Sequence, residues 1–582
     1  MMMQTSFRPM LPLLLASTYM QHAEALGIVG GAKQMQLQEM AERGLFPDGS
    51  PIDTPAGIKV SKLYTPAASA VTSNTTEVIN PEFVSLPLDH FSGDAGFFEN
   101  RFWVAESGYK GAGHPVFIYD AGETDASQNA LFRLQNSTSF FKQIVDAFGG
   151  IGIVWEHRYY GESVPVNINL DTAPEDFIYL TSEQALADVP VFAANFSRAN
   201  FPDVDLTPSS TPWIFIGGSY PGMRAAFMRE YYPETIFASF ASSAPVQAQN
   251  DMSVYFEPVY RGMNAYGFGN CSKDIHAAIN YMDELMENPA AAATLKTKFL
   301  GRNADKNSNA GFGDALSTIF WYWQSYGVEI SLRPFCDWIE TDHGSSNATN
   351  STVAGADGWA PSRGAEYVVE QWASYPGFAE TVSSSLDTIC EGSTPPTDNS
   401  TAPECNLEKR FEDPSSISWT WQYCTQWGFL QSANLGATQI VSRWNSLQHQ
   451  ADICHRQFPT ANETLLPAWP RDNATNESLG GWRIRPSNTY WSGGEFDPWR
   501  TLSPLSAEDW APHPTLTQHI PACNVSTDES EIFGYVMPGA QHAYDFRTTF
   551  PLGAVSRKYF TDALTEWLKC FKPSSDGDCG RY

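Results

Sequence analysis

The stretch that decides the fold is WIFIGGSYPGM, residues 213–223. A short apolar run, residues 213–216, leads into Gly-Gly-Ser and then into a run of helical composition, residues 224–229. A strand buried on both faces has such a continuous apolar pattern. Two glycines before a serine allow the sharp strand-to-helix turn of a nucleophile elbow. We therefore predict an α/β fold with Ser219 as a nucleophile, although a plain glycine-rich turn is an alternative.

Similar apolar runs recur on both sides of this stretch. The predicted strands are 97–104, 116–119, 152–155, 213–216, 237–241, 489–491 and 532–536. The predicted helices beside them are 182–194, 223–232 and a terminal amphipathic helix at 554–568. Strands that alternate with helices in this way are typical of a mostly parallel sheet covered by helices.

The rhythm stops in the middle of the chain. Residues 250–475 contain helix-like segments at 272–287, 310–326 and 438–455, together with Ser/Thr/Gly-rich spacers and most of the cysteines. A single hydrophobic core stops growing at about 250–300 residues, so a chain of 582 residues needs a second unit. We predict an α/β domain in two parts, 81–249 and 476–582, interrupted by a helical insertion at 250–475.

The N-terminal residues do not look like part of the fold. Arg8, the apolar run 10–16 and the small-x-small sequence at 23–25 predict a signal peptide over residues 1–25. The apolar run is shorter than the ~20 residues that a membrane span needs, and no later segment is long enough either. Residues 26–80, rich in Ala, Thr, Pro and Gly, predict a loosely structured leader or propeptide-like segment.

Charge excludes one class of partner. Against 35 Lys and Arg stand 65 Asp and Glu, a net charge of −30, which repels nucleic acid and anionic membrane surfaces. Aromatic residues make up 13% of the chain and charged residues only 17%, which indicates a packed rather than a disordered protein. The net charge falls toward zero near the isoelectric point of about 4.6, which suits acid surroundings.

Cysteines and glycosylation motifs indicate the compartment. All nine cysteines lie at or after Cys271, and none has the C-x-x-C spacing of a zinc or redox site, so we expect disulfides and no metal or cofactor. Eleven Asn-x-Ser/Thr motifs are candidate glycosylation sites: Asn74, Asn136, Asn195, Asn270, Asn347, Asn350, Asn399, Asn462, Asn473, Asn476 and Asn524. These features predict a secreted, lysosomal or vacuolar protein.

A nucleophilic serine needs a base and an orienting carboxylate. His542, in PGAQHAYD, and Asp497, in SGGEFDPW, each follow a predicted strand directly. The chain order Ser219, Asp497, His542 is that of an α/β-hydrolase triad. Singly, Asp497 could be a turn aspartate before proline and His542 a surface histidine, but their coincidence at strand ends favours the triad.

Four segments give a specific resemblance: GGSY at 217–220, EHRYYGES at 156–163, GEFDPW at 494–499 and GAQH at 539–542. The chain resembles the proline-cleaving serine peptidase family of lysosomal prolyl carboxypeptidase, dipeptidyl peptidase II and the fungal acid prolyl endopeptidases. Further matches are NCS at 270–272, FCD at 335–337 and WTWQYCTQWGF at 419–429, so the resemblance spans roughly residues 83–570. Pro221 departs from the Gly or Ser common in the family, which puts specificity in doubt more than catalysis.

The resemblance implies an α/β-hydrolase domain with a large, mainly helical, disulfide-bearing cap of the SKS type. Ser219 would be the nucleophile, His542 the general base and then acid, and Asp497 its orienting carboxylate. The amide of Tyr220 would bind the oxyanion, with a second donor around Ala121 and Gly122.

The resemblance also implies substrate contacts and disulfides. Glu123 would lie near a substrate's amino end, whereas Met223, Phe429 and Trp499 would line a proline pocket. The pairs Cys424–Cys454 and Cys271–Cys336 follow from the family. The pairs Cys390–Cys405 and Cys570–Cys579 rest only on proximity in sequence and would leave Cys523 unpaired.

We therefore expect a serine peptidase that acts on proline-containing peptides or proteins, with a homodimer allowed. Carboxypeptidase, dipeptidyl-peptidase and endopeptidase action all stay open. The alternatives are a lipase or esterase on the same scaffold, or a non-catalytic secreted glycoprotein. His157, between two charged residues, is interpreted as part of a structural cluster at a strand end.

Overall fold

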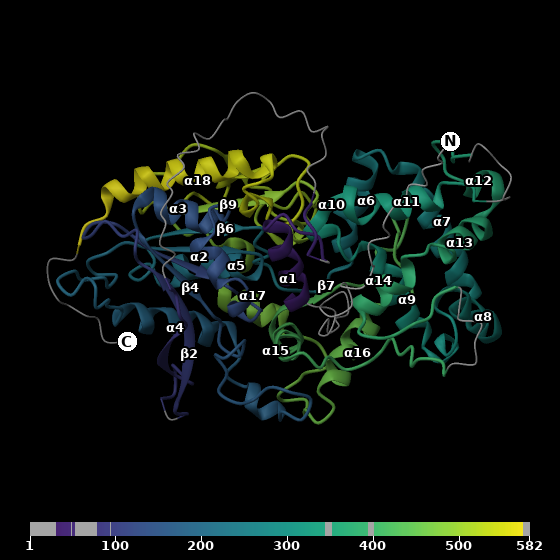
Figure 1. Ribbon diagram of the computed structural model, residues 1–582, viewed down its shortest axis with the longest axis horizontal. Helices are drawn as coiled ribbons and strands as arrows, with labels where there is room; N and C mark the ends of the chain where they lie inside the picture. Colours follow the sequence, from purple (N-terminus) through teal and green to yellow (C-terminus); the bar gives the residue numbers. More distant parts are fainter. Residues whose placement is uncertain are drawn as a thin grey trace, which may run out of the picture.

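The computed structural model describes residues 31–343, 352–393 and 401–573, apart from Asp48, residues 53–77 and Asp94. The expected signal peptide lies outside the described residues, as do Asn74, Asn347, Asn350, Asn399 and Cys579. A nine-stranded sheet in the order β1-β2-β4-β3-β5-β6-β9-β11-β10 forms the centre of one half of the molecule (Figure 1). Its strands are β1 (Glu82–Pro87), β2 (Phe97–Ala105), β3 (Val116–Asp120), β4 (Ile151–Trp155), β5 (Trp213–Gly218), β6 (Ala238–Ser242), β9 (Thr489–Gly494), β10 (Thr515–Thr517) and β11 (Glu531–Met537).

The strand directions identify the fold class. β2 runs antiparallel to both β1 and β4, whereas all other neighbours in the sheet are parallel. Two antiparallel strands at one edge, followed by a parallel sheet with crossover helices, form an α/β-hydrolase domain. The prediction of this fold is confirmed, and each of the seven predicted strands is present. The sequence did not predict the edge strands β1 and β10.

Helices cover both faces of the sheet. One face packs against α2 (Ala130–Gln135), α3 (Phe140–Phe148) and α18 (Ala554–Trp567), and the other against α4 (Ser182–Ala194) and α5 (Tyr220–Tyr231). In β5, Trp213 and Phe215 join one core cluster, and Ile214 and Ile216 join the other. Because successive side chains of a strand point to opposite faces, burial of both faces requires the unbroken apolar run of the sequence.

A helical cap lies beside the sheet domain, and most of it is at the right of Figure 1. It is built from segments between β6 and β9, including the short pair β7 (Gln249–Asp251) and β8 (Gly428–Leu430). Its helices are α6 (Phe256–Ala265), α7 (Gly269–Leu285), α8 (Pro289–Leu300), α9 (Asn309–Ser317), α10 (Trp323–Ser331), α11 (Arg333–Ile339), α12 (Ala360–Arg363), α13 (Ala365–Ala373), α14 (Phe378–Ser385), α15 (Pro414–Gln422), α16 (Leu447–Gln457) and α17 (Asp472–Leu479).

Two predicted cap helices differ from the structure. The segment 310–326 is divided between α9, a 3-10 turn at Thr318–Phe320 and α10, which is itself kinked at Gly327 with φ 70°. The segment 438–455 becomes helical only at Leu447, where Ser446 caps the helix by accepting a hydrogen bond from the His449 amide. Local capping and glycine geometry therefore override the helical composition of both segments.

Four disulfides are present in the described part of the chain: Cys271–Cys336, Cys390–Cys405, Cys424–Cys454 and Cys523–Cys570. The expected pair Cys570–Cys579 is wrong. Cys523 follows β10 in a connection that packs on the end of α18, where Trp567 Nε1 donates to the Pro521 carbonyl at 3.0 Å. Packing therefore brings Cys523 to Cys570 across 47 residues of sequence.

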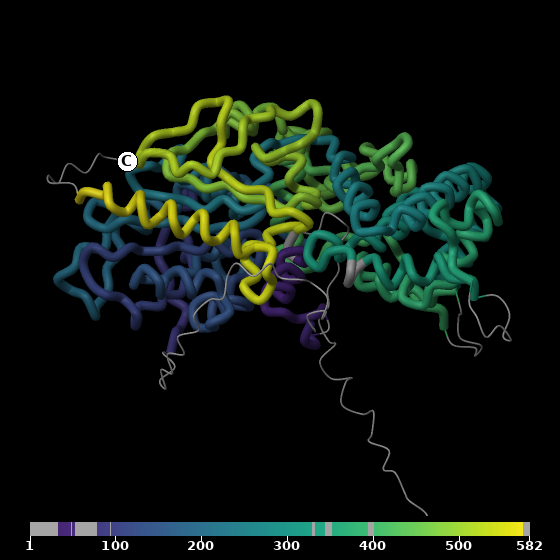
Figure 2. Tube along the Cα trace, turned by 90° about the horizontal axis from the view of Figure 1, so that it is seen from above, coloured from purple at the N-terminus to yellow at the C-terminus, as the bar shows by residue number. Residues whose placement is uncertain are grey.

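The leader contains regular structure, contrary to the prediction. Residues Gly31–Glu42 form a helix, α1, which lies at the junction of the sheet domain and the cap in both views (Figures 1 and 2). Its sequence has no amphipathic pattern that would reveal it. Among the described residues, no helix is long and apolar enough to cross a membrane.

Candidate active site

Ser219 occupies the turn between β5 and α5. Its backbone has φ 67° and ψ −131°, a conformation that a non-glycine residue rarely adopts. The turn is tight, because a Cβ added at Gly217 would lie 2.1 Å from the Pro221 carbonyl oxygen, and one at Gly222 would lie 2.3 Å from the Ser242 oxygen. The Ser219 amide donates to that Ser242 carbonyl at 2.9 Å, which holds the strained turn against β6. This is the geometry of a nucleophile elbow.

Asp497 and His542 are joined by a hydrogen bond. Nδ1 of His542 lies 2.9 Å from Oδ1 of Asp497, and both side chains are essentially buried, at 1% and 0% exposed. Asp497 follows β9, and His542 lies in the loop after β11. The two loops are tied together, since the Phe496 amide donates to the Ala540 carbonyl at 2.9 Å. Nε2 of His542 has no hydrogen-bond partner within the described residues, so it is available to a neighbouring hydroxyl.

The structure brings these three residues to one edge of the sheet. β5, β6, β9 and β11 are consecutive parallel neighbours, so their carboxyl ends lie side by side. A Cβ added at Gly218, beside the serine, would lie 3.5 Å from the Cβ of Ala543, beside the histidine. A serine at a strained elbow next to a carboxylate-bonded histidine is an arrangement suited to acyl transfer.

Asp545 anchors the histidine loop, and sequence reasoning missed it. Its buried carboxylate accepts hydrogen bonds from the hydroxyls of Ser242 at 2.6 Å, of Ser556 at 3.0 Å and of Ser492. These serines belong to β6, α18 and β9, so one carboxylate ties the loop to three elements. The residue stands three places after His542 in PGAQHAYD, which was the available signal.

The loop after β3 lies against the elbow. The Gly122 amide, expected as an oxyanion donor, donates to Oδ1 of Asp120 at 3.0 Å, and Oδ2 of Asp120 pairs with Nε of Arg224 at 2.8 Å. A Cβ added at Gly122 would lie 2.4 Å from Cγ of Pro221. Pro221, where the sequence departs from the family, therefore packs on Gly122.

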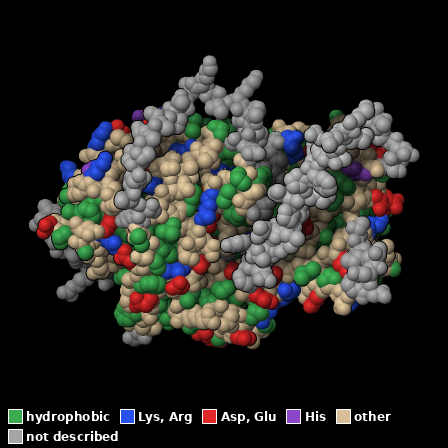
Figure 3. All heavy atoms as spheres, in the orientation of Figure 1, with side chains coloured by type: hydrophobic (Ala, Val, Ile, Leu, Met, Phe, Trp, Pro, Cys, Tyr) green, Lys and Arg blue, Asp and Glu red, His purple; other side chains and the backbone are tan. Residues whose placement is uncertain are grey.

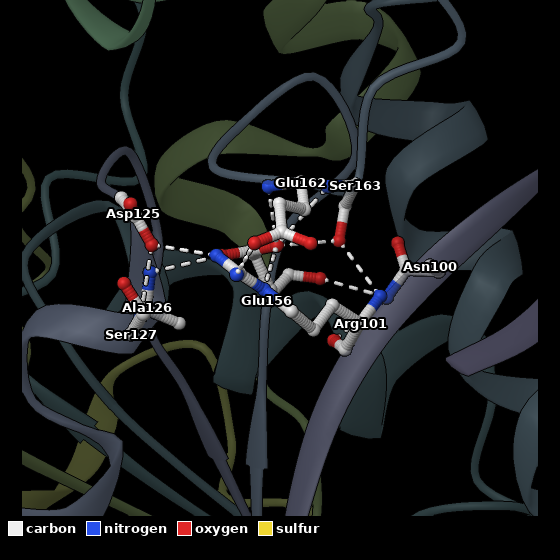
Figure 4. A network of polar contacts seen from close by, with 8 residues as sticks. All are labelled: Asn100, Arg101, Asp125, Ala126, Ser127, Glu156, Glu162 and Ser163. Carbon is white, nitrogen blue, oxygen red and sulfur yellow. Dashed lines mark hydrogen bonds and ion pairs between the residues drawn. The ribbon is translucent and has the colours of Figure 1, made fainter. Parts of the chain in front are cut away.

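The buried carboxylate of Glu156 holds this loop in place by hydrogen bonds (Figure 4). Its Oε1 accepts from Arg101 at 2.7 Å and from the Ala126 amide at 3.0 Å. Its Oε2 accepts from Arg101 Nε at 3.0 Å, from Ser163 Oγ at 2.8 Å, and from the amides of Glu162 and Ser163, both at 3.1 Å. We call this the Glu156 cluster. The Glu156 cluster contains the first and the last two residues of the EHRYYGES motif, so these residues have a structural role.

His157 belongs to a second buried network. Its Nδ1 lies 2.7 Å from the Arg158 carbonyl, which can only accept, so Nε2 accepts from the Tyr220 hydroxyl at 2.9 Å. The Tyr220 oxygen in turn accepts from Gln422 of the cap at 2.8 Å. Burial lowers the pKa of His157 well below its ordinary value, so the ring is neutral. His157 therefore positions the residue after Ser219.

A cavity of about 30 Å³ opens beside Ser219. It is lined by residues of the elbow, the β3 loop, the cap and α1: Gln34, Met35, Glu123, Ser219, Tyr220, Pro245, Gln324, Trp419, Phe429, Gln431 and Trp499. Phe429 has φ 61°, and its ring meets that of Trp499 edge-on at 5.2 Å between centroids. Met223, expected in the same pocket, is fully buried in the core and does not line the cavity.

Glu123 is 3% exposed in this cavity. Its Oε2 has no hydrogen-bond partner among the residues that the structure describes. Burial raises the pKa of Glu123 from its ordinary 4.5 to about 8. In the described ranges, no group of three or more His, Cys, Asp or Glu side chains is arranged to hold a metal ion.

The described glycosylation motifs differ in accessibility. The exposed asparagines are Asn136, Asn195, Asn462, Asn473 and Asn524. Asn476 is half-buried, and its amide bonds both the amide and the carbonyl of Ala248. Asn270 is also half-buried and donates to Glu340 at 2.9 Å. These two side chains would have to leave their contacts to carry a glycan.

Comparison with known proteins gives a family match over most of the chain. A family model described as "Serine carboxypeptidase S28" matches residues 86–550. A probable extracellular serine carboxypeptidase of Arthroderma benhamiae is 30% identical over 448 residues, which are 72% of this chain and 58% of that protein. A thymus-specific serine protease of Mus musculus is 27% identical, over 84% of this chain and 88% of that protein. A lysosomal Pro-X carboxypeptidase of Homo sapiens is 31% identical over 34% of this chain and 38% of its own length.

Proposed function

The chain belongs to the serine carboxypeptidase S28 family, and on that premise we propose that it is a serine peptidase that hydrolyses peptide bonds after proline. The observation that carries the proposal is the buried hydrogen bond between Asp497 and His542 beside the strained elbow of Ser219. A serine hydroxyl is a weak nucleophile at neutral or acid pH, so it needs a base held in this way.

The proposed reaction uses the three residues in sequence. His542 Nε2 takes the proton of the Ser219 hydroxyl as Oγ attacks the carbonyl carbon of the prolyl residue. Asp497 accepts a hydrogen bond from the Nδ1–H group and stabilises the imidazolium that forms, without taking the proton itself. The tetrahedral intermediate expels the amine, which receives the proton from His542, and leaves an ester on Ser219. Water, deprotonated by His542, then attacks that ester. The Ser219 oxygen leaves and takes the proton back from His542, which releases the acid and restores the free enzyme.

The oxyanion of the intermediate needs donors. The Tyr220 amide is the first of α5, and the first amides of a helix have no partner within it. We propose it as one donor. Gly122 is the proposed second donor, but its amide already serves Asp120 and would have to be shared or released on substrate binding.

The proposed proline pocket lies between Phe429 and Trp499. Aromatic faces select a flat, apolar ring that lacks an amide donor. Nε1 of Trp499 donates to Gln324 Oε1 at 2.9 Å, which fixes the indole ring. Met223 would influence this pocket only through the core behind it.

The end of the substrate that the enzyme recognises depends on Glu123. A carboxylate there would favour a free amine and dipeptidyl-peptidase action. With α1 in place the pKa of Glu123 is about 8, so the side chain is neutral in acid and offers no ion pair. Carboxypeptidase and endopeptidase action therefore stay within the proposal.

Secretion, or delivery to a lysosome or vacuole, completes the proposal. Four disulfides in the described part of the chain suit an oxidising compartment. We propose glycans on the exposed asparagines given above and a cap domain over residues 250–475.

On the face that Figure 3 shows, basic side chains are scattered among acidic ones, which supports peptides rather than nucleic acid as substrates.

A fluorophosphonate probe together with product analysis tests the function. We expect the probe to label Ser219 and the Ser219→Ala variant to be unlabelled, with its unfolding temperature unchanged. Mass spectrometry of products from proline-containing peptides, from acid to neutral pH, should show cleavage after proline by protein from which the segment before β1 has been removed. Hydrolysis of acyl esters by that protein with no cleavage of any peptide would favour the esterase alternative. A Ser219 that stays unlabelled in folded protein both with and without the segment before β1 would favour a non-catalytic glycoprotein.

A further inference from the structure

Helix α1 is largely buried although half of its residues are polar. Its sequence is GAKQMQLQEMAE, and from Gln34 to Glu42 only Gln36 is exposed and Met40 half-buried. Glu39 and Glu42 are 4% and 1% exposed. An isolated helix of this length is marginal in water, so α1 depends on the surfaces that enclose it.

Those surfaces belong to both halves of the molecule. At the start of α1, Gln34 Nε2 donates to the Trp321 carbonyl of the cap at 2.9 Å, and Lys33 donates to the Ser384 carbonyl of α14. At its end, Glu42 forms a buried ion pair with Arg133 of α2 in the sheet domain. The helix therefore contacts both the cap and the sheet domain, and Figures 1 and 2 show it at their junction.

The first part of α1 lies at the cavity that contains the nucleophile. Gln34 and Met35 line the cavity that also contains Ser219 and Tyr220. The cavity volume is about 30 Å³, which leaves room for about two water molecules. Pockets for drug-sized ligands have volumes on the order of 300 Å³ or more. A peptide cannot reach Ser219 while α1 is in place.

The contact is incompletely satisfied. Within the described residues, several buried polar atoms have no hydrogen-bond partner. They are the oxygens Gln34 Oε1, Gln38 Oε1 and Glu123 Oε2 and the nitrogen Nε of Arg133. Buried polar atoms without partners weaken an interface. Moreover, α1 precedes β1, the first strand of the sheet along the chain, so the sheet is built without the segment that contains α1. These features suit a segment that leaves, and not one on which the fold depends.

We infer that α1 is a built-in inhibitor: residues 31–43 bind across the active-site cleft and exclude substrate from Ser219 until they are cut from the chain and released. The inference rests on the proposed function, because it concerns access to the same serine. The ligand of the cleft is here a short, polar helical peptide of the chain itself, held by the cap at one end and by Arg133 at the other.

Controlled cutting tests the inference. A recognition sequence for a site-specific protease is placed between Ile52 and Val78 of the full chain, and the cut fragment is removed by gel filtration. The readout is the rate at which a fluorophosphonate labels Ser219, which does not depend on proline preference. We expect labelling to be at least about tenfold faster after release, because only the open fraction reacts in the uncut chain.

Point variants of the uncut chain provide a second test with a matched control. Met35→Arg places a charge in the cavity and should speed labelling of Ser219, whereas Gln36→Arg adds the same charge at the exposed neighbouring position and should leave the rate unchanged. A synthetic peptide of residues 31–52, added to the cut and purified enzyme, should slow labelling, and its Met35→Arg version should not.

The outcomes separate the two proposals. Equal labelling rates before and after release of the fragment would overturn the inhibitor while leaving the nucleophile intact. If Ser219 is unlabelled in both forms, and proline peptides remain uncut by both, the proposed function fails and the inference fails with it. Equal rates for Met35→Arg and Gln36→Arg would contradict the placement of α1 over the cavity.

Discussion

The Glu156 cluster and the contact of α1 with the sheet domain both bury an arginine–glutamate pair, yet they are built differently. In the cluster, both carboxylate oxygens of Glu156 accept several hydrogen bonds, and Arg101 also pairs with Asp125 and Glu162 (Figure 4). In the α1 contact, Arg133 pairs with Glu42, but its Nε and one terminal nitrogen have no hydrogen-bond partner within the described chain.

The difference separates a permanent contact from a removable one. A buried charge whose hydrogen bonds are all made is costly to disturb, whereas one that keeps unpaired donors has lost hydration without full compensation. Arg133 instead stacks on Tyr119, with 4.4 Å from its guanidinium carbon to the ring centroid. The sheet domain can therefore retain Arg133 through this stacking when Glu42 leaves.

The largest expected effect concerns a third buried carboxylate, that of Asp497, which serves as a reference for the two contacts compared above. Asp497→Asn should lower kcat/KM by about 10⁴-fold, because the amide favours the wrong histidine tautomer. The free energy of unfolding should change far less. Steady-state kinetics on the cut, fragment-free enzyme and urea unfolding would measure the two. A loss of activity below about tenfold would remove Asp497 from the triad.

Next in size, Glu156→Gln breaks the fully bonded pair. We expect a loss of about 3–5 kcal/mol in the free energy of unfolding, because Arg101 keeps its buried charge without the principal counter-charge. Urea or thermal denaturation followed by circular dichroism would report it. Stability equal to that of the wild type would mean that the cluster is no stronger than the α1 contact.

The matched change in the other contact is Glu42→Gln. The change in unfolding free energy should stay within about 1 kcal/mol, since Arg133 already lacks some partners and keeps its ring contact. In the uncut chain, labelling of Ser219 should instead become several-fold faster. The opposite pattern, lost stability with unchanged labelling, would show that α1 is a structural element.

The smallest effect is a dependence of α1 binding on pH. Burial raises the pKa of Glu39 from 4.5 to about 8, with Arg133 and Arg43 opposing the shift and Glu42 and Glu123 adding to it. Glu123 has the same raised pKa of about 8. Bound α1 therefore holds extra protons, so its binding is strongest below pH 4.5 and weakens as the pH rises toward 8.

The measurement is a ratio of two labelling rates. The rate in the uncut chain, divided by that in the cut enzyme, removes the pH dependence of the labelling reaction itself. We expect this ratio to rise as the pH increases from about 5 to 8. A ratio that falls over this range would mean that acid, and not cutting, releases the helix.

The sheet was predictable because burial of both faces leaves a direct mark on sequence. Val116–Asp120 and Trp213–Gly218 are strands for that reason. The positions of Ser219, Asp497 and His542 were predictable because each directly follows such a strand. Their joint assignment as a triad remains a proposal until Ser219 is labelled.

Other features depend on partners distant in sequence. Helix α1 shows no apolar stripe, because its partners are the cap and the sheet domain and not one flat core. The bond between Cys523 and Cys570 depends on how a loop folds over α18. Met223 was expected in the pocket, but the helical turn after the elbow carries it into the core.

The first cysteine of the chain is Cys271, so none of the disulfides can tether the N-terminal segment. While the chain is intact, its covalent connection to the sheet domain keeps α1 at an effective concentration on the order of millimolar around its cleft. A single cut ends that advantage, and the freed peptide is diluted to the concentration of the protein. The switch would then be irreversible without any change in the strength of the contacts themselves.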